Sequence, residues 1–262
     1  MFLVTLLILG YRIYNRVDRM SFGIDTLFIT ILLLALTIAP GIGIGIYIHW
    51  RDRFDREPRT LLLKSFLFGM LAIIPPVIIQ LIADVLGFNS KVNIANTAFY
   101  AFIIVALSEE LSKYAVLRMY AFPKKEFNEP FDGITYSVMI AMGFATLENI
   151  FYVFDGDVER GVEVAMLRMV TAVPAHAADA VLMGYFAGLA KFRHDGQSLQ
   201  VTAVMVAVIA HGMYDFFIFL EHLGLVALGA FVVLAAAITL AMRAIKLHNI
   251  RSPFYNNNHL HY

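Results

Sequence analysis

Three charged side chains lie inside an apolar stretch at residues 105–117, VALSEELSKYAVL. They are Glu109, Glu110 and Lys113, and both carboxylates can reach the ammonium because residues three or four apart share one face of a helix. A charge at the centre of a membrane helix costs about 2.5–3.5 kcal/mol on an insertion scale. Such groups persist where they pair inside a bundle or take part in a reaction. This turn is therefore either a neutralised helix contact or part of a site.

Later apolar stretches carry further ionisable groups, namely Glu148, His176, Asp179, His211 and Asp215, with Arg168 nearer the end of its stretch. Glu109, His176 and His211 each fall within about two residues of the centre of their stretch, or about 3 Å along a helix. Each histidine has a carboxylate three or four residues further on, which can fix its tautomer. A single buried histidine is more often a packing residue. Ionisable groups at one depth on four consecutive stretches indicate a common site.

A carboxylate and imidazoles that are sheltered from bulk water suit the hydrolysis of an amide. One group takes a proton from water and returns it to the leaving amine, while donors stabilise the developing oxyanion. Glutamate and histidine can instead hold a metal ion whose bound water is the nucleophile, and both schemes remain open. The sequence has no H-E-x-x-H, no G-x-S-x-G and no G-x-G-D motif, and the absence of cysteine excludes a thiol nucleophile.

The composition is that of a membrane protein. Hydrophobic residues make up 60% of the 262 residues and charged residues 15%, against about 25% charged in a soluble domain. A helix needs about 20 apolar residues to cross the hydrocarbon core, which predicts an all-α polytopic transmembrane helical bundle with about seven to eight spans. Seven spans are predicted at residues 26–49, 63–86, 96–121, 134–154, 164–190, 199–220 and 224–245, and residues 1–11 are short for an eighth.

Basic residues collect in alternate connections, and this predicts the orientation because lysine and arginine are retained on the cytoplasmic side. Four arginines lie in RDRFDREPR, two lysines in PKKEFNEPFDG, and a lysine and an arginine in KFRHDG. The C-terminus is therefore expected in the cytoplasm, although three arginines at residues 12–19 would then lie outside. We expect a partial or interfacial segment at 1–25, a transmembrane domain at 26–245 and a polar tail at 246–262. A net charge of zero gives no sign of nucleic-acid binding.

Four motifs follow one another along the chain: EELSK at 109–113, FDGITYSVMIAMGFATLENIFYVF at 131–154, LRMVTAVPAHAADAVLMGYFAG at 167–188 and HGMYD at 211–215. With the upstream segment RDRFDREPRTLLLKSFLFG at 51–69, they resemble the PrsW family of intramembrane proteases. That family belongs to the wider group of CAAX prenyl endopeptidases and bacteriocin-processing proteases. The resemblance runs from about residue 40 to residue 245, and four ordered motifs are more specific than any one of them.

The resemblance implies an essential glutamate pair, Glu109 and Glu110, in an EExxK motif that Lys113 completes. The second motif of the family is a phenylalanine followed four residues later by a glutamate. It matches Phe144 and Glu148, where many members of the wider group have histidine instead. The oxyanion donors of the wider group therefore do not transfer directly to this chain.

The two later histidines of the family match His176 and His211, and the acidic or amide residue of the last motif matches Asp215. In the wider group the first glutamate is thought to activate water, while the histidines and the last-motif side chain bind the oxyanion. Asn149 and Asp179 are counted with Lys113, Phe144 and Asp215 as supporting residues.

The family is often labelled a metalloprotease, so the resemblance allows either no cofactor or a single zinc ion held by Glu148, His176 and His211. We predict an intramembrane endopeptidase of a prokaryotic cell membrane that cuts a membrane-anchored protein with a water activated by Glu109. The prototype of the family cuts an anti-sigma factor. One alternative is a non-catalytic receptor or scaffold that keeps the charges as a structural network. Another is a proton-coupled transporter, for which inverted repeats are expected and none is found in this sequence.

Overall fold

The computed structural model describes residues 24–88, 93–155 and 157–254. Within these residues all regular secondary structure is helical, and seven helical segments are long and apolar enough to cross a membrane. This confirms the prediction of an all-α transmembrane bundle. Residues 1–11 and most of the segment predicted at 1–25 lie outside the described residues, as does the end of the tail predicted at 246–262.

The spans are built from the following helices. The first is α2 (Ile24–Arg51), and the second consists of α3 (Arg59–Leu71) and α4 (Ile74–Val85). The third is a continuous rod of α5 (Ile94–Phe99), η1 (Tyr100–Ala106), α6 (Leu107–Val116) and η2 (Leu117–Ala121). The others are α7 (Pro130–Val153), α8 (Val158–Val170) with α9 (Ala172–Phe192), α10 (Gly196–Phe219), and η3 (Glu221–Leu228) with α11 (Gly229–Ile250).

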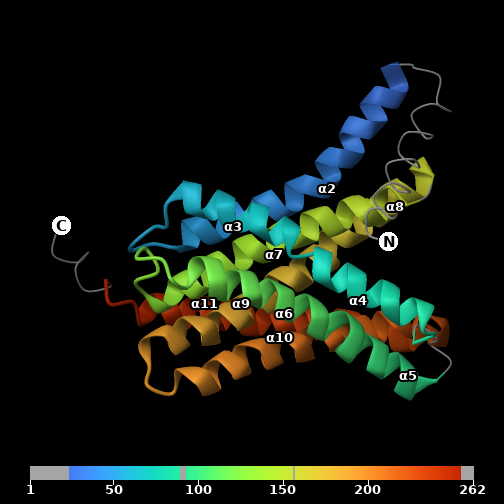
Figure 1. Ribbon diagram of the computed structural model, residues 1–262. Helices are drawn as coiled ribbons and strands as arrows, with labels where there is room; N and C mark the ends of the chain where they lie inside the picture. Colours follow the sequence, from blue (N-terminus) through green and yellow to red (C-terminus); the bar gives the residue numbers. More distant parts are fainter. Residues whose placement is uncertain (1–23, 89–92, 156, 255–262) are drawn as a thin grey trace.

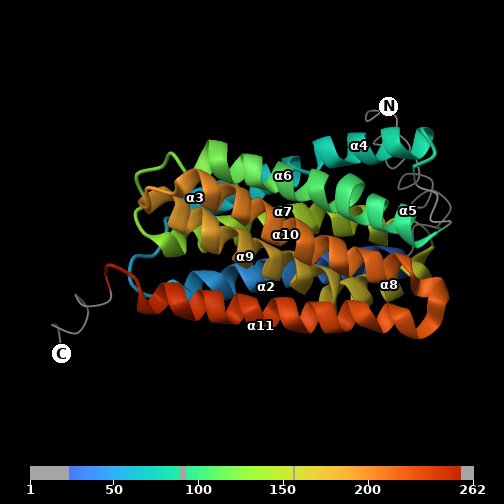
Figure 2. The same cartoon turned by 90° about the horizontal axis from the view of Figure 1, so that it is seen from below.

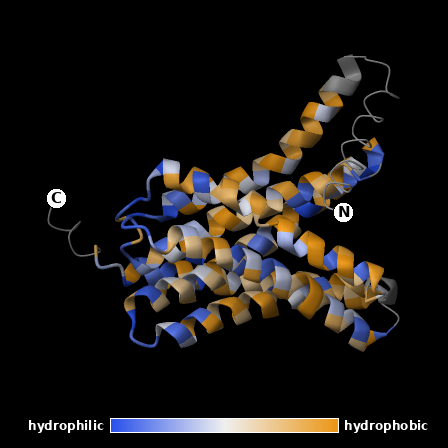
Figure 3. Cartoon of the chain, viewed as in Figure 1, coloured by the Kyte–Doolittle hydropathy of each residue, from blue (hydrophilic) through white to orange (hydrophobic). Residues whose placement is uncertain are grey.

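The spans run roughly side by side, and their connections gather at two ends of the bundle (Figures 1 and 2). One end holds the α2–α3, η2–α7 and α9–α10 connections and the end of α11, and we call it the basic end. Figure 3 shows hydrophilic residues concentrated at this end and hydrophobic residues along the helices. Many large apolar side chains stay exposed on the flanks of the bundle, as is expected where hydrocarbon rather than water covers them.

Helix α7 is the central element and packs against α3, α9, α2 and α8. Glycines allow the neighbouring backbone of α3 to approach it closely. A Cβ atom at Gly143 of α7 would lie 1.9 Å from the carbonyl oxygen of Phe66, and one at Gly69 of α3 would lie 2.0 Å from that of Ile140. Small residues at such crossings permit the close packing that holds membrane helices together. Helix α7 is therefore fixed in place, together with the second predicted motif that it carries.

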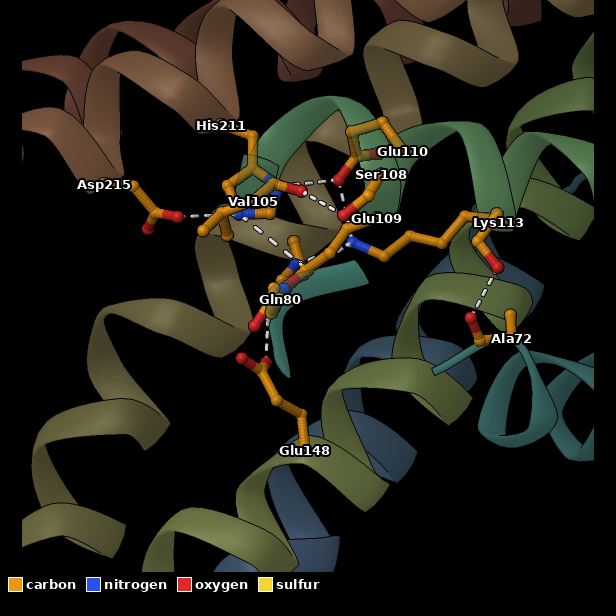
Figure 4. Close-up of polar contacts among 12 residues, drawn as sticks. Ala72, Gln80, Val105, Ser108, Glu109, Glu110, Lys113, Glu148, His211 and Asp215 are labelled. Carbon is orange, nitrogen blue, oxygen red and sulfur yellow. Dashed lines mark hydrogen bonds and ion pairs between the residues drawn. The ribbon is translucent and has the colours of Figure 1, made fainter. Parts of the chain in front are cut away.

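The second span is broken between α3 and α4, where Pro75 and Pro76 lie in the first turn of α4. Proline has no N–H group, so Pro76 cannot donate to the carbonyl oxygen of Ala72 four residues earlier. The hydroxyl group of Ser112 on α6 donates to that oxygen instead (Figure 4). This contact fastens the start of α4 to the helix that carries the EExxK motif.

The fifth span is longer than predicted. It begins at Val158 rather than at residue 164, because the first turns of α8 are polar and do not register as an apolar stretch. It also bends at Thr171, where φ is −122° and ψ is −74°, and this bend separates α8 from α9. The last span likewise continues beyond the predicted residue 245 to Ile250.

Four carboxyl groups are buried close together at the basic end, and we call them the acidic cluster: Asp52, Glu57, Glu129 and Asp132. The carboxylate of Asp132 accepts a hydrogen bond of 2.8 Å from the amide of Glu129 and so caps α7. Ser252 donates to Glu129 from the end of the described chain. Burial raises the pKa of Asp52 to about 8 and that of Glu57 to about 7. The Asp52 carboxyl is therefore mainly protonated at neutral pH.

Candidate active site

Helix α6 carries the EExxK motif between the π-helical stretches η1 and η2. Wide helical turns of this kind are frequent at functional sites. The ammonium Nζ of Lys113 lies 2.7 Å from Glu110 Oε1 and 3.5 Å from Glu109 Oε2, and all three side chains are buried (Figure 4). The predicted contact of one ammonium with two carboxylates is therefore present.

His211 on α10 is held between carboxylates. Its Nδ1 lies 2.7 Å from Glu110 Oε1, and its Nε2 lies 3.3 Å from the Oδ2 of Asp215, one turn further along the same helix. The same Nε2 is 3.9 Å from Glu109 Oε2. Because both ring nitrogens face acceptors, the arrangement is that of a doubly protonated imidazolium. Asp215 braces the ring as its spacing predicted, and His211 directs Nε2 toward Glu109.

His176 on α9 has a different electrostatic environment. Lys113 Nζ lies 3.1 Å from its Nδ1, and Glu148 Oε2 on α7 lies 2.9 Å from its Nε2. An ammonium can only donate, so Nδ1 accepts and Nε2 carries the proton that Glu148 accepts. His176 is therefore a neutral imidazole with both nitrogens engaged. Its ring meets that of His211 edge to face, with the centroids 5.2 Å apart.

Arg168 joins the cluster from α8, a contact that the sequence analysis did not predict. Its Nη2 donates to Glu148 Oε2 at 2.7 Å, and its Nε donates to Asn149 Oδ1 at 2.6 Å. The guanidinium also lies over the ring of Tyr152, 4.2 Å from the centroid. The negative charge of Glu148 is thus paired with an arginine.

Gln80 on α4 is a second side chain that the sequence analysis missed. Its Nε2 donates to Glu109 Oε1 at 3.2 Å. The other oxygen, Glu109 Oε2, is buried and has no hydrogen-bond partner among the described residues. Figure 4 shows this carboxylate between Gln80 on one side and His211 and Lys113 on the other. Since buried polar atoms are nearly always hydrogen-bonded, Glu109 Oε2 is the open acceptor of the site.

The cluster unites the residues that the sequence predicted at one depth: Glu109, Glu148, His176 and His211. Phe144 lies against it, with Lys113 Nζ 4.2 Å from the centroid of its ring. Glu109 and Glu110 are neighbours in the sequence, and both carboxylates approach His211. A glutamine within the apolar run PPVIIQLIA was the available signal for Gln80. For Arg168 the signal was a cation near the end of one span and an unpaired glutamate on the span before it.

Two groups of three described residues bring possible metal-ligand atoms within 4.8 Å of one another: Glu109, His176 and His211, and Glu110, Asp179 and His211. Asp179 therefore lies beside His211 rather than behind His176, and Glu148 belongs to neither group. As the side chains lie, Glu148 Oε2 is engaged by both Arg168 Nη2 and His176 Nε2, and the ligand set of Glu148 with the two histidines stays a prediction.

The first group also does not fit a metal ion as it stands. A catalytic zinc ion needs three ligands with free lone pairs. Both nitrogens of His176 and both nitrogens of His211 are engaged by charged partners. The ammonium of Lys113 already supplies positive charge beside Glu109 Oε2. The reaction is therefore derived below from side chains alone.

Comparisons with known proteins agree with these motifs. The model of the family described as "PrsW family intramembrane metalloprotease" matches residues 57–242. A protein named Protease PrsW from Geobacillus kaustophilus is 36% identical over 184 residues, which cover 70% of this chain and 78% of that protein. Proteins of the same name from Bacillus subtilis and Clostridioides difficile are 33% and 34% identical, over 70% and 72% of this chain and 81% and 80% of their own lengths. No solved structure matches the chain significantly.

Proposed function

This chain belongs to the PrsW family of intramembrane proteases, and from that premise we propose that it hydrolyses a peptide bond with a water molecule activated by Glu109. Seven apolar spans among the described residues and its bacterial relatives support an integral protein of a bacterial membrane. The resemblance to the CAAX group supports the same role for the first glutamate of the EExxK motif. The substrate we propose is a membrane-anchored protein, with an anti-sigma factor as the first candidate.

The open oxygen of Glu109 is the observation that carries this proposal. Gln80 donates to Oε1, whereas Oε2 has no hydrogen-bond partner among the described residues and lies 3.5 Å from Lys113 Nζ and 3.9 Å from His211 Nε2. A water molecule that donates to Oε2 would lie beside two cationic donors. A general base needs an acceptor within hydrogen-bond reach of the proton it takes, and an oxyanion needs preorganised donors. Glu109 Oε2 is the acceptor for the proton of the water, and Lys113 Nζ and His211 Nε2 are the nearby donors for the oxyanion in this proposal.

The reaction follows from these positions. The water gives one proton to Glu109 Oε2 as its oxygen bonds to the carbonyl carbon of the substrate. The carbonyl oxygen becomes an oxyanion, and the proposed donors to it are Lys113 Nζ and His211 Nε2, which shares its proton with Asp215. The C–N bond then breaks, and the proton on Glu109 passes to the leaving nitrogen. The products are a new carboxyl terminus and a new amino terminus, and Glu109 is ready for another turnover.

The other residues of the cluster hold this arrangement in place. Glu110 accepts from both Lys113 and His211, so it fixes the two donors relative to each other. Glu148 fixes the tautomer of His176, which keeps that ring neutral beside the ammonium of Lys113. Positioning of this kind is what general acid–base catalysis by a buried carboxylate requires.

We further propose that the basic end faces the cytoplasm, which places the C-terminus there. The support is the collection of lysines and arginines in the connections at that end. Because the chain has no cysteine, single cysteines can be introduced at Arg53 or Lys125 and tested with an impermeant thiol reagent. Labelling in inverted vesicles but not in intact cells is expected, and the opposite pattern would reverse the orientation.

Peptide cleavage by the purified protein tests the catalytic proposal. The wild type and Glu109→Gln are incubated in lipid nanodiscs with a library of single-span membrane peptides, and the products are read by mass spectrometry. Loss of a general base lowers rates by about 10²–10⁴-fold, so the variant should fall by at least about 100-fold. Glu163→Gln, an exposed site on α8, is the matched control and should cleave at the wild-type rate. Retention of activity in Glu109→Gln would refute the assignment of the base.

A further inference from the structure

An apolar groove of about 430 Å³ opens on the flank of the bundle between α2 and α3. Met139 of α7 lies at its base, and the exposed side chains of Ile46 and Leu63 form its sides. A volume of roughly 300–1,000 Å³ is typical of ligand sites that are lined mainly by apolar side chains. The groove lies on the outer surface of the spans and is separate from the cluster around Glu109.

Two glycines of α2 line the groove and bring this helix against α7. A Cβ atom at Gly41 would lie 2.8 Å from Thr146 Oγ1, and one at Gly45 would lie 3.0 Å from Met139 Sδ. Because neither glycine has a side chain, this stretch of α2 leaves apolar surface uncovered beside α3. The groove therefore follows the GIGIG segment at residues 41–45.

One end of the groove is polar. The guanidinium of Arg59 and the imidazole of His49 line it there, and a second arginine, Arg56, lies near His49. The Nδ1 atom of His49 is buried and has no hydrogen-bond partner among the described residues. Two carboxyl groups of the same connection, Asp52 and Glu57, are turned into the acidic cluster, where burial raises the pKa of each. Asp52 is therefore mainly uncharged at neutral pH, and Glu57 is only partly ionised.

We propose that this groove binds one anionic phospholipid, with an acyl chain along Gly41 and Gly45 and the phosphate group at Arg59 and His49. The apolar lining suits a hydrocarbon chain, and the guanidinium group is suited to a phosphate through paired hydrogen bonds. Trp50 borders the same end and is 66% exposed. Tryptophan is enriched at the level of lipid headgroups, so the charged end of the groove lies where a phosphate would be.

A transmembrane helix of a substrate is the alternative occupant, and the size of the groove opposes it. One turn of helix, about 10 Å wide and 5.4 Å long, occupies roughly 400 Å³. The groove therefore accommodates about one turn, whereas a spanning helix has five or more. A single acyl chain is narrower and can lie along the full groove.

Native mass spectrometry tests the proposal directly. Purified protein is equilibrated with dioleoyl phosphatidylglycerol or dioleoyl phosphatidylcholine, and the number of retained lipids is compared. The wild type should retain one phosphatidylglycerol at least threefold better than phosphatidylcholine. Arg59→Gln should abolish this preference and Arg59→Lys should keep part of it, while the exposed neighbour Lys64→Gln, which does not line the groove, should leave it unchanged. Equal retention of the two lipids by the wild type, or equal losses in Arg59→Gln and Lys64→Gln, would overturn the proposal.

A second variant separates the apolar part of the site from its charge. Ile46→Trp fills the groove from an exposed position and should remove the retained lipid while thermal unfolding and helix content stay near the wild type. If Ile46→Trp retains the lipid but blocks photo-crosslinking of a membrane peptide, the groove belongs to the substrate and the lipid proposal is wrong. Neither readout depends on peptide cleavage, so this inference and the proposed function can fail independently.

Discussion

The ion pair between Arg168 and Glu148 offers a quantitative test of how the cluster is stabilised. Replacing Arg168 with glutamine removes the cation 2.7 Å from Glu148 Oε2 and leaves that carboxylate with His176 as its remaining close donor. At an effective dielectric constant of about 20, the Coulomb energy at this distance is about 6 kcal/mol, most of which is offset by desolvation. Removing one partner of a buried pair costs about 3–5 kcal/mol. Because the side chains are 14% and 15% exposed, we expect the lower limit, about 3 kcal/mol.

A double-mutant cycle isolates the pair from other effects of the substitution. Arg168→Gln, Glu148→Gln and the double variant are unfolded with denaturant in detergent micelles, and the free energy of unfolding is compared with the wild type. The double variant has no uncompensated charge, so we expect it to be more stable than Arg168→Gln, with a coupling energy of about 2 kcal/mol or more. Arg160→Gln, at an exposed position on the same helix, is the control for loss of charge alone. A coupling energy below about 0.5 kcal/mol would refute the view that Arg168 neutralises Glu148.

Three further predictions concern the charges of the molecule. Lys113→Met should slow cleavage and move the acidic limb of the pH–activity profile to higher pH, because the ammonium favours the ionised form of Glu109; Lys64→Met is the control, and an unchanged profile would contradict the contact. Treatment with a strong chelator should leave peptide cleavage intact, and elemental analysis should find no stoichiometric transition metal; loss of activity that zinc but not calcium restores would overturn the metal-free reaction. Burial raises the pKa of Asp52 to about 8 and of Glu57 to about 7, so the folded state holds more protons than the unfolded state between about pH 4 and pH 8. The free energy of unfolding should therefore fall as pH rises through this range, by up to about 1.4 kcal/mol per pH unit for each group, and Asp52→Asn should flatten the slope in denaturant titrations.

The sequence predicted the main part of the site because the membrane makes charge expensive. Only a few ionisable residues lie near the centres of the spans, so a shared depth was enough to bring Glu109, His176 and His211 together. The period of the helix then correctly predicted that Asp215 braces His211. Both inferences need only the position of a residue along its own helix. Neither requires knowing which helices pack against each other.

The positions of Gln80 and Arg168 in the site depend on helix breaks and bends that a hydropathy profile does not show. Gln80 reaches Glu109 only because α4 starts anew after a proline break and is held there by α6. Arg168 appeared to lie near the end of its span, but the bend at Thr171 and the added polar turns of α8 place it well inside the fifth span, against Glu148. Pairings between helices also decide which side chains could share a metal ion, and a hydropathy profile does not show them.

The hydrogen bond from Ser112 to Ala72 has a consequence for the order in which the protein is assembled. The second span is synthesised with a carbonyl group that Pro76 cannot satisfy, and an unpaired carbonyl in hydrocarbon costs several kcal/mol. Its donor is encoded 40 residues later, on the third span. The second span therefore cannot reach its final conformation on its own after insertion. It does so only when the third span has inserted beside it and Ser112 can donate to the carbonyl oxygen of Ala72. Helix α4 takes its final position at that step, so a half-inserted chain has no Gln80 against Glu109 and no assembled base.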